Sequence, residues 1–364
     1  MKAAVLYAPN TPLVIEEVST KKPAAHEVLV RTAIAGLCHS DLHFIEGLYP
    51  HPLPAVLGHE AAGIVEQVGS EVTYVQPGDH VISCLSVFCG FCAYCNSGRP
   101  AICSNTEVKM APGKARRLDW EKPEQLHSFL NLSAFGELML VHENALAKIR
   151  KDMPLDRAAL IGCGVITGYG AVVNTAKVSP GETVAVIGCG GVGMAAVNGA
   201  YIAGAGRVIA VDTNPAKLQL ATKMGATDLV NPKDGDAVEA VRALTKGGVH
   251  HAVECLGLKE TVEQAFAMLA AGGTATVVGM VPVGQKIELN GYDFLSERRI
   301  QGSLMGSNRF RIDMPRLIEL YMQGRLHLDD WISERIALEE INEGFTAMKE
   351  GRVLRSVIDF GVSA

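Results

Sequence analysis

A short apolar run that leads straight into a glycine-rich turn constrains the fold more than any other segment. Residues 183–187 read TVAVI, which is typical of a buried strand. GCGGVG follows at 188–193, and an alanine-rich stretch at 192–203 has the apolar spacing of a helix. A strand, a tight turn and a helix in this order begin a βαβ unit, so a parallel sheet is expected here.

Strand and helix patterns go on alternating after this unit. Further strands are expected at 207–211, 252–254 and 274–278, and helices at 215–224, 237–244 and 262–269. Parallel strands joined by helices form a doubly wound sheet with helices on both faces. The central part of the chain is therefore predicted to be an α/β domain of this kind.

The rest of the chain has a different pattern. Up to about residue 142, short β-rich runs such as 27–33, 61–68 and 80–82 are separated by Gly and Pro, which predicts an irregular, mostly β domain. Residues 105–127 are polar and read as an exposed loop. The tail predicts helices at 312–322 and 338–349 and a last strand at 357–360. With 364 residues, two domains are the natural expectation.

Charge and composition narrow the function. The net charge is −6 and no Lys/Arg-rich run is present, so a nucleic-acid partner is not expected. The N-terminus meets a proline at position 9 and reads as a strand rather than a signal peptide, and we expect no membrane-spanning run. A cytoplasmic location follows, in which the nine cysteines favour metal binding or catalysis over disulfides.

The glycine turn predicts a dinucleotide site. Gly188 permits the tight turn, Gly190 lets backbone approach a pyrophosphate, and Gly193 lets the helix pack on the sheet. Gly191 and Val192 open the helix, whose free N–H groups favour phosphate.

Asp212 ends the next strand, about 20 residues further on, where a carboxylate can bind the two ribose hydroxyls. It would repel a 2′-phosphate, so NAD is expected rather than NADP. The alternative is a glycine turn with an aspartate that only caps a helix.

Four cysteines lie close together on one short segment: Cys89, Cys92, Cys95 and Cys103. Four thiolates complete a tetrahedral zinc and leave no position for a substrate, so this pattern predicts a structural zinc site. Free buried cysteines, a redox pair and an iron–sulfur cluster are the alternatives.

A second group is spread along the chain. Cys38, His59 and Cys163 would supply two sulfurs and one nitrogen and leave a fourth position for water or an alcohol oxygen. Asp41 and Glu60 could orient His59. Spacing alone leaves this grouping open, since a single cysteine is more often a core residue and a single histidine more often a residue with satisfied hydrogen bonds.

Together these motifs resemble the zinc-containing medium-chain alcohol dehydrogenases, from Met1 to about Phe360. Two cysteines and a histidine are the ligands known for the catalytic zinc of that family. The resemblance implies two zinc ions per subunit, NAD, and a GroES-like mostly-β catalytic domain at 1–164 and 304–364 with the zinc lobe at 89–103, around a Rossmann domain at 165–303.

The resemblance also implies roles for single residues. Cys38, His59 and Cys163 would hold the catalytic zinc, while Ser40 would take the alcohol proton and pass it through the ribose hydroxyl to His43. The implied cofactor contacts are His39 and Arg355 at the pyrophosphate and Lys217 at the adenosine ribose. The zinc would act as a Lewis acid while hydride moves to the nicotinamide.

Three positions depart from the usual family pattern. His39 stands where many relatives have Arg, which should weaken the hold on the pyrophosphate and speed NADH release. Leu85 replaces a common aromatic residue and Ser40 a frequent Thr, so a wider pocket is expected. The implied substrates are primary alcohols over a broad range, including bulky or aromatic ones, and the implied assembly is a homodimer, with a tetramer as the alternative.

Two rival functions remain. A glutathione-dependent formaldehyde dehydrogenase would need a basic pocket, for which Arg116 and Arg117 are candidates. A zinc-ribbon binding module or an NAD sensor without turnover is the rival from another class, and the acidic net charge and the complete proton relay argue against it.

Overall fold

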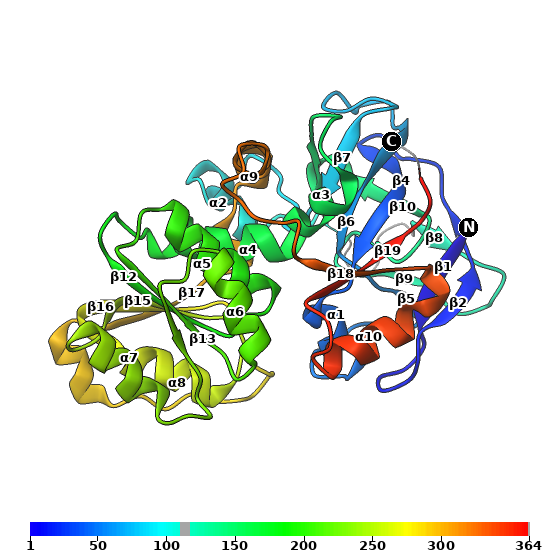
Figure 1. Ribbon diagram of the computed structural model, residues 1–364. Coiled ribbons are helices and arrows are strands. Elements are labelled where there is room, and N and C mark those ends of the chain that lie inside the picture. Colours follow the sequence, from blue (N-terminus) through cyan, green and yellow to red (C-terminus); the bar gives the residue numbers. More distant parts are fainter. Residues whose placement is uncertain (110–116, 363–364) are drawn as a thin grey trace. The chain divides into compact units, whose positions relative to one another are not determined.

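The computed structural model describes residues 1–109 and 117–362, which form two compact units. Unit 1 comprises Met1–Cys163, Arg309–Met322 and Leu328–Ala364, and unit 2 comprises Gly164–Asn308 and Gln323–His327. Both chain termini therefore belong to unit 1, while the central segment makes up most of unit 2 (Figure 1).

Unit 1 is built on a seven-stranded sheet in the order β11-β7-β6-β4-β19-β18, with β10 also paired to β4. A second sheet has the order β2-β1-β5-β9, and β3 pairs with β8. The strand bounds are β1 Lys2–Leu6, β2 Val14–Glu17, β3 Ser19–Thr20, β4 Glu27–Gly36, β5 Ala55–Val56, β6 Glu60–Val68, β7 His80–Ser83, β8 Leu118–Asp119, β9 His127–Ser128, β10 Leu138–His142, β11 Leu146–Lys148, β18 Ile332–Ile336 and β19 Arg355–Asp359.

The α-helices described in unit 1 range from four to 13 residues in length. They are α1 His39–Ile45, α2 Ala93–Asn96, α3 Leu155–Leu160, α9 Phe310–Met322 and α10 Ile341–Lys349, with 3-10 turns at Pro100–Ile102, Glu143–Ala145 and Leu338–Glu340. The expected strands and both tail helices are present, so the mostly β, GroES-like character of this unit is confirmed.

The tail is tied into the same core as the first strands. The last strand, β19, pairs antiparallel with β4, with Ile358 opposite Ala35. Arg311 of α9 lies 3.6 Å from the ring centre of Tyr74 and donates to the carbonyl oxygens of Glu143 and Leu146. A guanidinium with an aromatic face and two carbonyl acceptors can be largely buried, and here it holds the returning chain in place.

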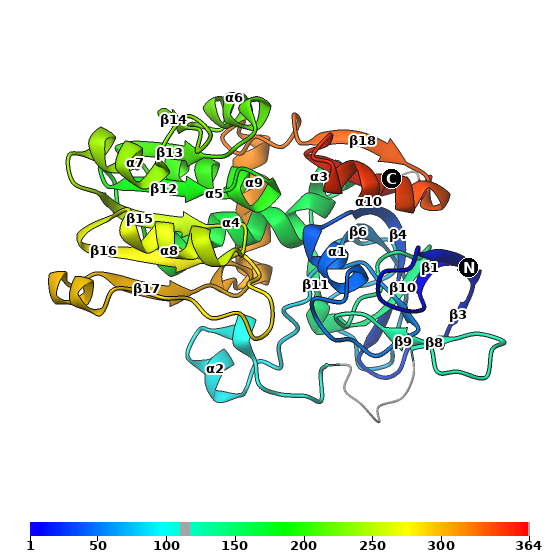
Figure 2. The ribbon, with the colours of Figure 1, turned by 90° about the horizontal axis from the view of Figure 1, so that it is seen from below.

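Unit 2 is a six-stranded parallel sheet in the order β14-β13-β12-β15-β16-β17 (Figure 2). Helices α5 and α6 cover one face and α7 and α8 the other (Figure 1). The bounds are β12 Thr183–Ile187, α5 Gly191–Ile202, β13 Arg207–Val211, α6 Pro215–Lys223, β14 Asp228–Val230, α7 Ala237–Thr245, β15 Val249–Glu254, α8 Lys259–Ala267, β16 Leu269–Val277 and β17 Arg299–Gly302, with 3-10 turns at Gly291–Ser296 and Met305–Ser307. The predicted doubly wound sheet is confirmed.

One continuous helical stretch was not expected. Residues Leu155–Ala176 include α3, α4 (Ile166–Gly170) and π-helical turns at Ile161–Val165 and Ala171–Ala176. By length and composition this stretch could cross a membrane, so the expectation that no run reaches that length was wrong. However, 78% of its most apolar window is buried inside the protein, which is typical of a core helix.

Candidate functional site

Three side chains that are far apart in the sequence converge in unit 1. The ligand atoms of Cys38, His59 and Cys163 all lie within 4.8 Å of one another, and all three residues are buried. The Nε2 atom of His59 is 3.2 Å from the Sγ atom of Cys163. Two sulfurs and one imidazole nitrogen suit zinc and leave a fourth tetrahedral position for another ligand.

The backbone brings these residues together from three elements. Cys38 is the N-cap of α1, His59 comes directly before β6, and Cys163 lies in the π-helical turn Ile161–Val165. Single π-helical turns within α-helices are frequent at functional sites. Gly162 permits the close approach of this turn to β7, because a Cβ atom there would lie 2.9 Å from the carbonyl oxygen of Ser83.

The carboxylate of Asp41 fixes the orientation of His59. Its Oδ1 atom is 2.9 Å from Nδ1 of His59, and its Oδ2 atom accepts a hydrogen bond of 3.3 Å from the backbone N–H of Cys38. Both side chains are fully buried. Since Nδ1 is held by Asp41, Nε2 is the nitrogen left for a metal, which is the arrangement usual for metal-binding histidines.

Electrostatics favour a thiolate at this centre. The hydrogen bond from Cys163, together with the positive charges of Arg355 and His59, holds the pKa of the Cys38 thiol well below its usual value, although burial opposes this. Burial alone would lower the pKa of His59, but Asp41 and Cys38 outweigh it and raise that pKa. A metal ion would take the place of these protons, as expected of a site whose ligands bind it deprotonated.

Glu60 and Arg355 lie beside the same centre. Arg355 is 4% exposed, and its Nη1 atom donates a hydrogen bond of 2.7 Å to the carbonyl oxygen of Leu37. Its Nη2 atom is 3.4 Å from Oε2 of the fully buried Glu60. The carboxylate seen in contact with the His59 ring is that of Asp41, whereas Glu60 is paired with Arg355. A contact of Arg355 with a pyrophosphate stays a prediction.

The two residues expected to move a proton follow Cys38 on α1. The Oγ atom of Ser40 is 3.7 Å from the Sγ atom of Cys38, and Ser40 is partly exposed. His43 stacks on Tyr49 with ring centres 6.1 Å apart, and its Nδ1 atom has no hydrogen-bond partner among the described residues. Burial lowers the pKa of His43, although the charges of Cys38 and Glu46 oppose this.

The remaining expectations for this part of unit 1 concern surface and pocket residues. His39 begins α1 and is exposed, as a cofactor contact would require. Leu85 is partly buried and packs against the hydrophobic core of unit 1. Arg117, a candidate for recognising glutathione, is buried and forms an ion pair of 2.7 Å with Glu27, so its charge is already neutralised. Arg116 lies outside the described residues.

The four cysteines of the lobe form a second cluster, Cys89, Cys92, Cys95 and Cys103. Three measured Sγ–Sγ separations are 3.5 Å for Cys92–Cys95, 3.8 Å for Cys92–Cys103 and 3.9 Å for Cys89–Cys95. A tetrahedron with zinc–sulfur bonds of about 2.3 Å has edges of about 3.8 Å, so the sulfurs already have the spacing that zinc requires.

Backbone N–H groups prepare the lobe for a metal. Those of Cys95 and Ser104 lower the pKa of the Cys92 thiol to about 5, which favours its thiolate at neutral pH. The N–H groups of Cys89 and Cys92 lie 3.4 Å and 3.3 Å from the sulfurs of Cys103 and Cys89, respectively. The N–H groups of Cys95 and Ser104 therefore favour a thiolate at Cys92, whereas burial raises the pKa of the Cys95 thiol to about 12. Four thiolates would complete the coordination of zinc.

The glycine turn in unit 2 has the geometry that a dinucleotide needs. Gly188 has φ +89°, and a Cβ atom on Gly193 would lie 1.7 Å from the carbonyl oxygen of Gly188. A Cβ atom on Gly190 would meet nothing within 4 Å. Gly191 is the first residue of α5, so the N-terminal N–H groups of this helix border that open space.

Asp212 lies next to this turn. Its Oδ2 atom accepts a hydrogen bond of 2.7 Å from the N–H of Cys189, and Oδ1 accepts one of 2.8 Å from Asn214. Lys217 is in the first turn of α6 and is partly exposed. The fingerprint and its acidic residue are thus physically joined at the carboxyl ends of β12 and β13.

The sequence patterns did not single out Glu254, the last residue of β15. It is fully buried at the carboxyl edge of the same sheet. The signal was present, because a carboxylate that ends a buried strand, in VHHAVE, is uncommon without a partner.

Comparisons with known proteins agree with this geometry. The family described as alcohol dehydrogenase GroES-like domain matches residues 24–151, and the zinc-binding dehydrogenase family matches residues 191–322. The chain is 40% identical to an alcohol dehydrogenase class-3 of Pisum sativum, over 98% of this chain and 97% of that one. It is also 40% identical to an S-(hydroxymethyl)glutathione dehydrogenase of Synechocystis, over 99% of each.

A solved structure, the benzyl alcohol dehydrogenase of Acinetobacter calcoaceticus, superposes with a TM-score of 0.93 at 34% identity over 98% of both chains. These matches extend over nearly the whole chain and agree with both cysteine clusters and with the glycine turn. The chain therefore belongs to the zinc-containing medium-chain alcohol dehydrogenase family.

Proposed function

We propose that this protein oxidises alcohols with NAD⁺ and reduces the corresponding aldehydes or ketones, using a zinc ion held by Cys38, His59 and Cys163. The convergence of these three donors, with a fourth position left for substrate, is the observation that carries the proposal. A second zinc at the four-cysteine lobe would serve the structure only. Residues 1–164 and 304–364 would form the catalytic domain, and residues 165–303 the cofactor domain.

When bound, zinc supplies a Lewis acid that makes the alcohol hydroxyl more acidic, and NAD⁺ accepts the hydride. The chain supplies the rest. Asp41 keeps the imidazole of His59 in one orientation through the contact of 2.9 Å. Ser40, beside Cys38, would accept the hydroxyl proton while giving up its own, and neutral His43 would take up a proton at the end of this relay and release it to solvent. The Nδ1 atom of His43 has no hydrogen-bond partner among the described residues.

NAD is the proposed cofactor rather than NADP. The glycine turn and the N-terminus of α5 would bind the pyrophosphate, and Asp212 would accept hydrogen bonds from the adenosine ribose. Lys217, His39 and Arg355 are proposed as further cofactor contacts. An exposed imidazole at position 39 gives weaker phosphate binding than an arginine would.

The proposed substrates are primary alcohols over a broad range, including bulky and aromatic ones. By resemblance to the family, Leu85 stands in place of a common aromatic residue and Ser40 in place of a frequent Thr, and the wider pocket that this implies supports the choice. The benzyl alcohol dehydrogenase that superposes on the chain has an aromatic substrate by name.

Oxidation of S-(hydroxymethyl)glutathione is a second candidate, because the relative from Synechocystis carries that activity in its name. The buried ion pair of Arg117 with Glu27 removes one expected contact for the carboxylates of glutathione. If formaldehyde is oxidised only when glutathione is present, the second candidate is correct.

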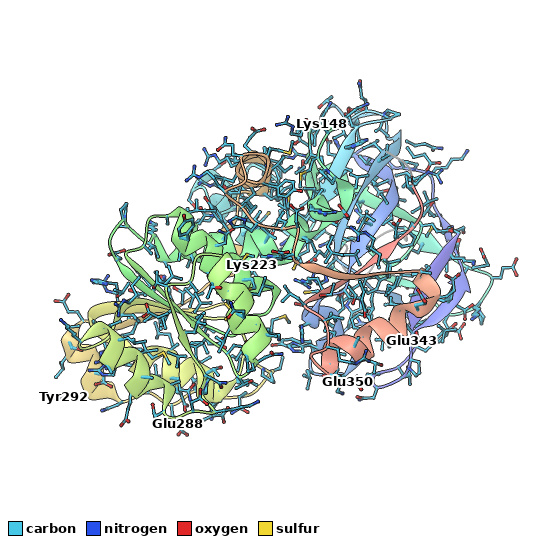
Figure 3. The ribbon with its side chains drawn as sticks, in the orientation of Figure 1. Lys148, Lys223, Glu288, Tyr292, Glu343 and Glu350 are labelled. Atoms are coloured by element: carbon cyan, nitrogen blue, oxygen red, sulfur yellow. The ribbon has the colours of Figure 1, made fainter. Side chains whose placement is uncertain are left out.

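We also propose a homodimer in the cytoplasm. Strand β17 pairs only with β16 in the described sheet, which leaves one edge of the sheet open (Figure 2). Nearby apolar side chains are exposed: Val283 70%, Tyr292 76% and Leu295 78%. Tyr292 points outward at this end of unit 2 (Figure 3). A second copy related by a two-fold axis would cover both features. None of the nine cysteines forms a disulfide, as expected in a reducing compartment.

The test is a panel of aliphatic, benzylic and secondary alcohols, assayed with NAD⁺ and with NADP⁺ alongside zinc analysis. We expect two zinc ions per subunit, turnover with NAD⁺, and benzylic alcohols among the good substrates. Absence of NAD⁺ reduction with every alcohol by the two-zinc protein would mean that the chain only binds the cofactor. Sedimentation of the wild type and Leu295→Glu tests the dimer, which the variant should dissociate.

A further inference from the structure

The carboxylate of Glu254 is fully buried where three turns of unit 2 meet. Its Oε1 atom accepts three hydrogen bonds of 2.8 Å, from the N–H groups of Leu256 and Gly257 and from the hydroxyl of Thr261. Three donors on one oxygen stabilise the loop after β15 in a single conformation, and a buried carboxylate needs such partners.

The same residue also holds the turn after β16. The backbone carbonyl oxygen of Glu254 accepts hydrogen bonds of 2.9 Å from Val278 and 3.0 Å from Gly279. A Cβ atom on Gly279 would lie 2.0 Å from the backbone nitrogen of Gly257 and 2.6 Å from Oε2 of Glu254. The turns after β15 and β16 are therefore in direct contact around one side chain.

A third turn, that of the glycine fingerprint, completes the arrangement. A Cβ atom on Gly188 would lie 2.5 Å from the side chain of Leu256. Glu254 accepts the N–H groups of Leu256 and Gly257, and the residues Leu256 and Leu258 of this loop are 43% and 52% exposed. The loop thus presents apolar groups at the carboxyl edge of the sheet.

The sheet order indicates which half of a cofactor this loop faces. Successive strands are added from β12 toward β14 on one side of the sheet and from β15 toward β17 on the other. Ligands bind at such a switch point, here between β12 and β15, beyond the carboxyl ends of the strands. Asp212 directly follows β13, on the side of the switch point where the adenosine ribose is proposed to bind. The remaining half of the dinucleotide, which carries the nicotinamide, then falls to the β15–β16 side.

The α8 helix provides a second reason for a carboxylate at this position. Its N-cap, Leu258, makes no side-chain cap hydrogen bond, and Thr261 lies in its first turn. The positive end of the helix dipole favours a negative charge nearby. Through the hydroxyl of Thr261, Glu254 therefore links the first turn of α8 to the loop in front of it.

We infer that Glu254 is a positioning residue for the nicotinamide half of the cofactor: its side chain fixes the loop after β15, which contacts the turn after β16 at Gly279, so that Leu256 lies against the glycine turn and the nicotinamide side of the crevice keeps its shape. This inference rests on the proposed use of NAD. Glu254 would act through the loop and make no contact with the reacting atoms, so its loss should change cofactor affinity more than it changes the chemistry.

The test compares two probes, NADH and ADP-ribose, which lacks the nicotinamide. Affinities are measured by titration for the wild type, Glu254→Gln and Glu254→Ala. We expect Glu254→Ala to weaken NADH binding about tenfold, as for the loss of one to two charge-assisted hydrogen bonds, while ADP-ribose binding changes by less than about twofold. Glu254→Gln keeps an acceptor oxygen and should fall between the wild type and Glu254→Ala.

Asn198→Ala is the matched control. Asn198 is also fully buried in unit 2, where it donates a hydrogen bond of 3.2 Å to Met224 and accepts one of 3.0 Å from His327. This variant should lower the melting temperature without changing the ratio of the two affinities. Equal weakening of NADH and ADP-ribose in the Glu254 variants, or no weakening of either, would overturn the inference.

If Glu254→Ala does not fold, the ratio in Glu254→Gln decides. Failure of this inference differs from failure of the proposed function, because wild-type protein that bound no NADH would refute the function, whatever the variants did.

Discussion

The two cysteine clusters contain the same chemical group but use it differently. The lobe takes all four ligands from one short segment, Cys89 to Cys103, and three of these four residues are only partly buried. The other centre takes its ligands from positions 38, 59 and 163, and all three are buried. The lobe can complete the coordination of a zinc ion by local folding, whereas the ligands of the other centre meet only when the whole of unit 1 folds.

The number of donors differs as well. Four sulfurs satisfy tetrahedral zinc, while two sulfurs and one nitrogen leave a position for substrate. In the second centre the carboxylate of Asp41 orients His59. In the lobe, backbone N–H groups hydrogen-bond to the sulfur of Cys92 and favour its thiolate. A metal that serves stability is therefore enclosed by its own loop, and one that serves chemistry is built from distant segments that leave it open.

The largest expected effect comes from Cys163→Ser. Removing a ligand of the open centre should lower alcohol turnover about a thousandfold or more and reduce zinc from two to one per subunit, because the Lewis acid is lost. Metal analysis and steady-state assays measure both. Cys84→Ala, at a buried cysteine outside both clusters, should keep two zinc ions and most of the activity. Full turnover in Cys163→Ser would place the catalytic centre elsewhere.

Cys103→Ser should have the opposite profile. The lobe would lose its zinc, and the free energy of unfolding should fall by about 3 kcal/mol or more, because the metal stabilises only the folded lobe. Turnover per folded molecule should stay within about threefold of wild type. Urea unfolding with and without chelator measures the first effect. If turnover fell as far as in Cys163→Ser, the division between a structural and a catalytic metal would be wrong.

Asp41→Asn should have an intermediate effect. The amide keeps the size of the side chain but loses the charge that holds His59, so zinc affinity at the open centre should fall about 10- to 100-fold. Competition with a chromophoric chelator measures this affinity. The zinc in the lobe should exchange at the wild-type rate, and that rate is an internal control in the same sample.

His43→Gln should give the smallest change and the clearest dependence on pH. His43 can accept a proton only when it is neutral, and burial lowers its pKa below the ordinary value of 6.5. Alcohol oxidation by the wild type should therefore fall as the pH decreases through that lowered pKa and recover above it. In His43→Gln turnover should drop about tenfold and lose this acid limb, whereas Cys103→Ser should retain it. An unchanged pH profile in His43→Gln would exclude His43 from the proton path.

Much of the fold was predictable because its signals are local. The strands of unit 2 are apolar runs bounded by glycine, and its helices have apolar residues at helical spacing. The order of strands and helices in this unit could therefore be predicted. The helical stretch Leu155–Ala176 was missed because its glycines and π-helical turns interrupt the regular spacing on which such readings depend. The ion pair of Arg117 with Glu27 was also not foreseeable, since these residues are 90 positions apart.

In the candidate site, too, local contacts could be predicted from the sequence and long-range contacts could not. The contact between Asp41 and Cys38 had a local signal, because the two positions match the ends of a capping box at the start of α1. The burial of Arg355 beside Glu60 had no such signal, since it depends on the pairing of β19 with β4. The position of Glu254 became meaningful only when the turns after β12, β15 and β16 were seen in contact.

By itself, the sequence determined the chemical groups and the local elements: the four-cysteine lobe, the glycine turn with its acidic partner, and the order of strands and helices. These depend on neighbouring residues, so spacing encodes them. Only the tertiary structure decided which distant donors meet, which carboxylate orients His59, and which arginines are already paired. Such contacts are set by packing across the fold, where a few ångströms of backbone position decide whether two side chains touch, and no sequence spacing records that distance.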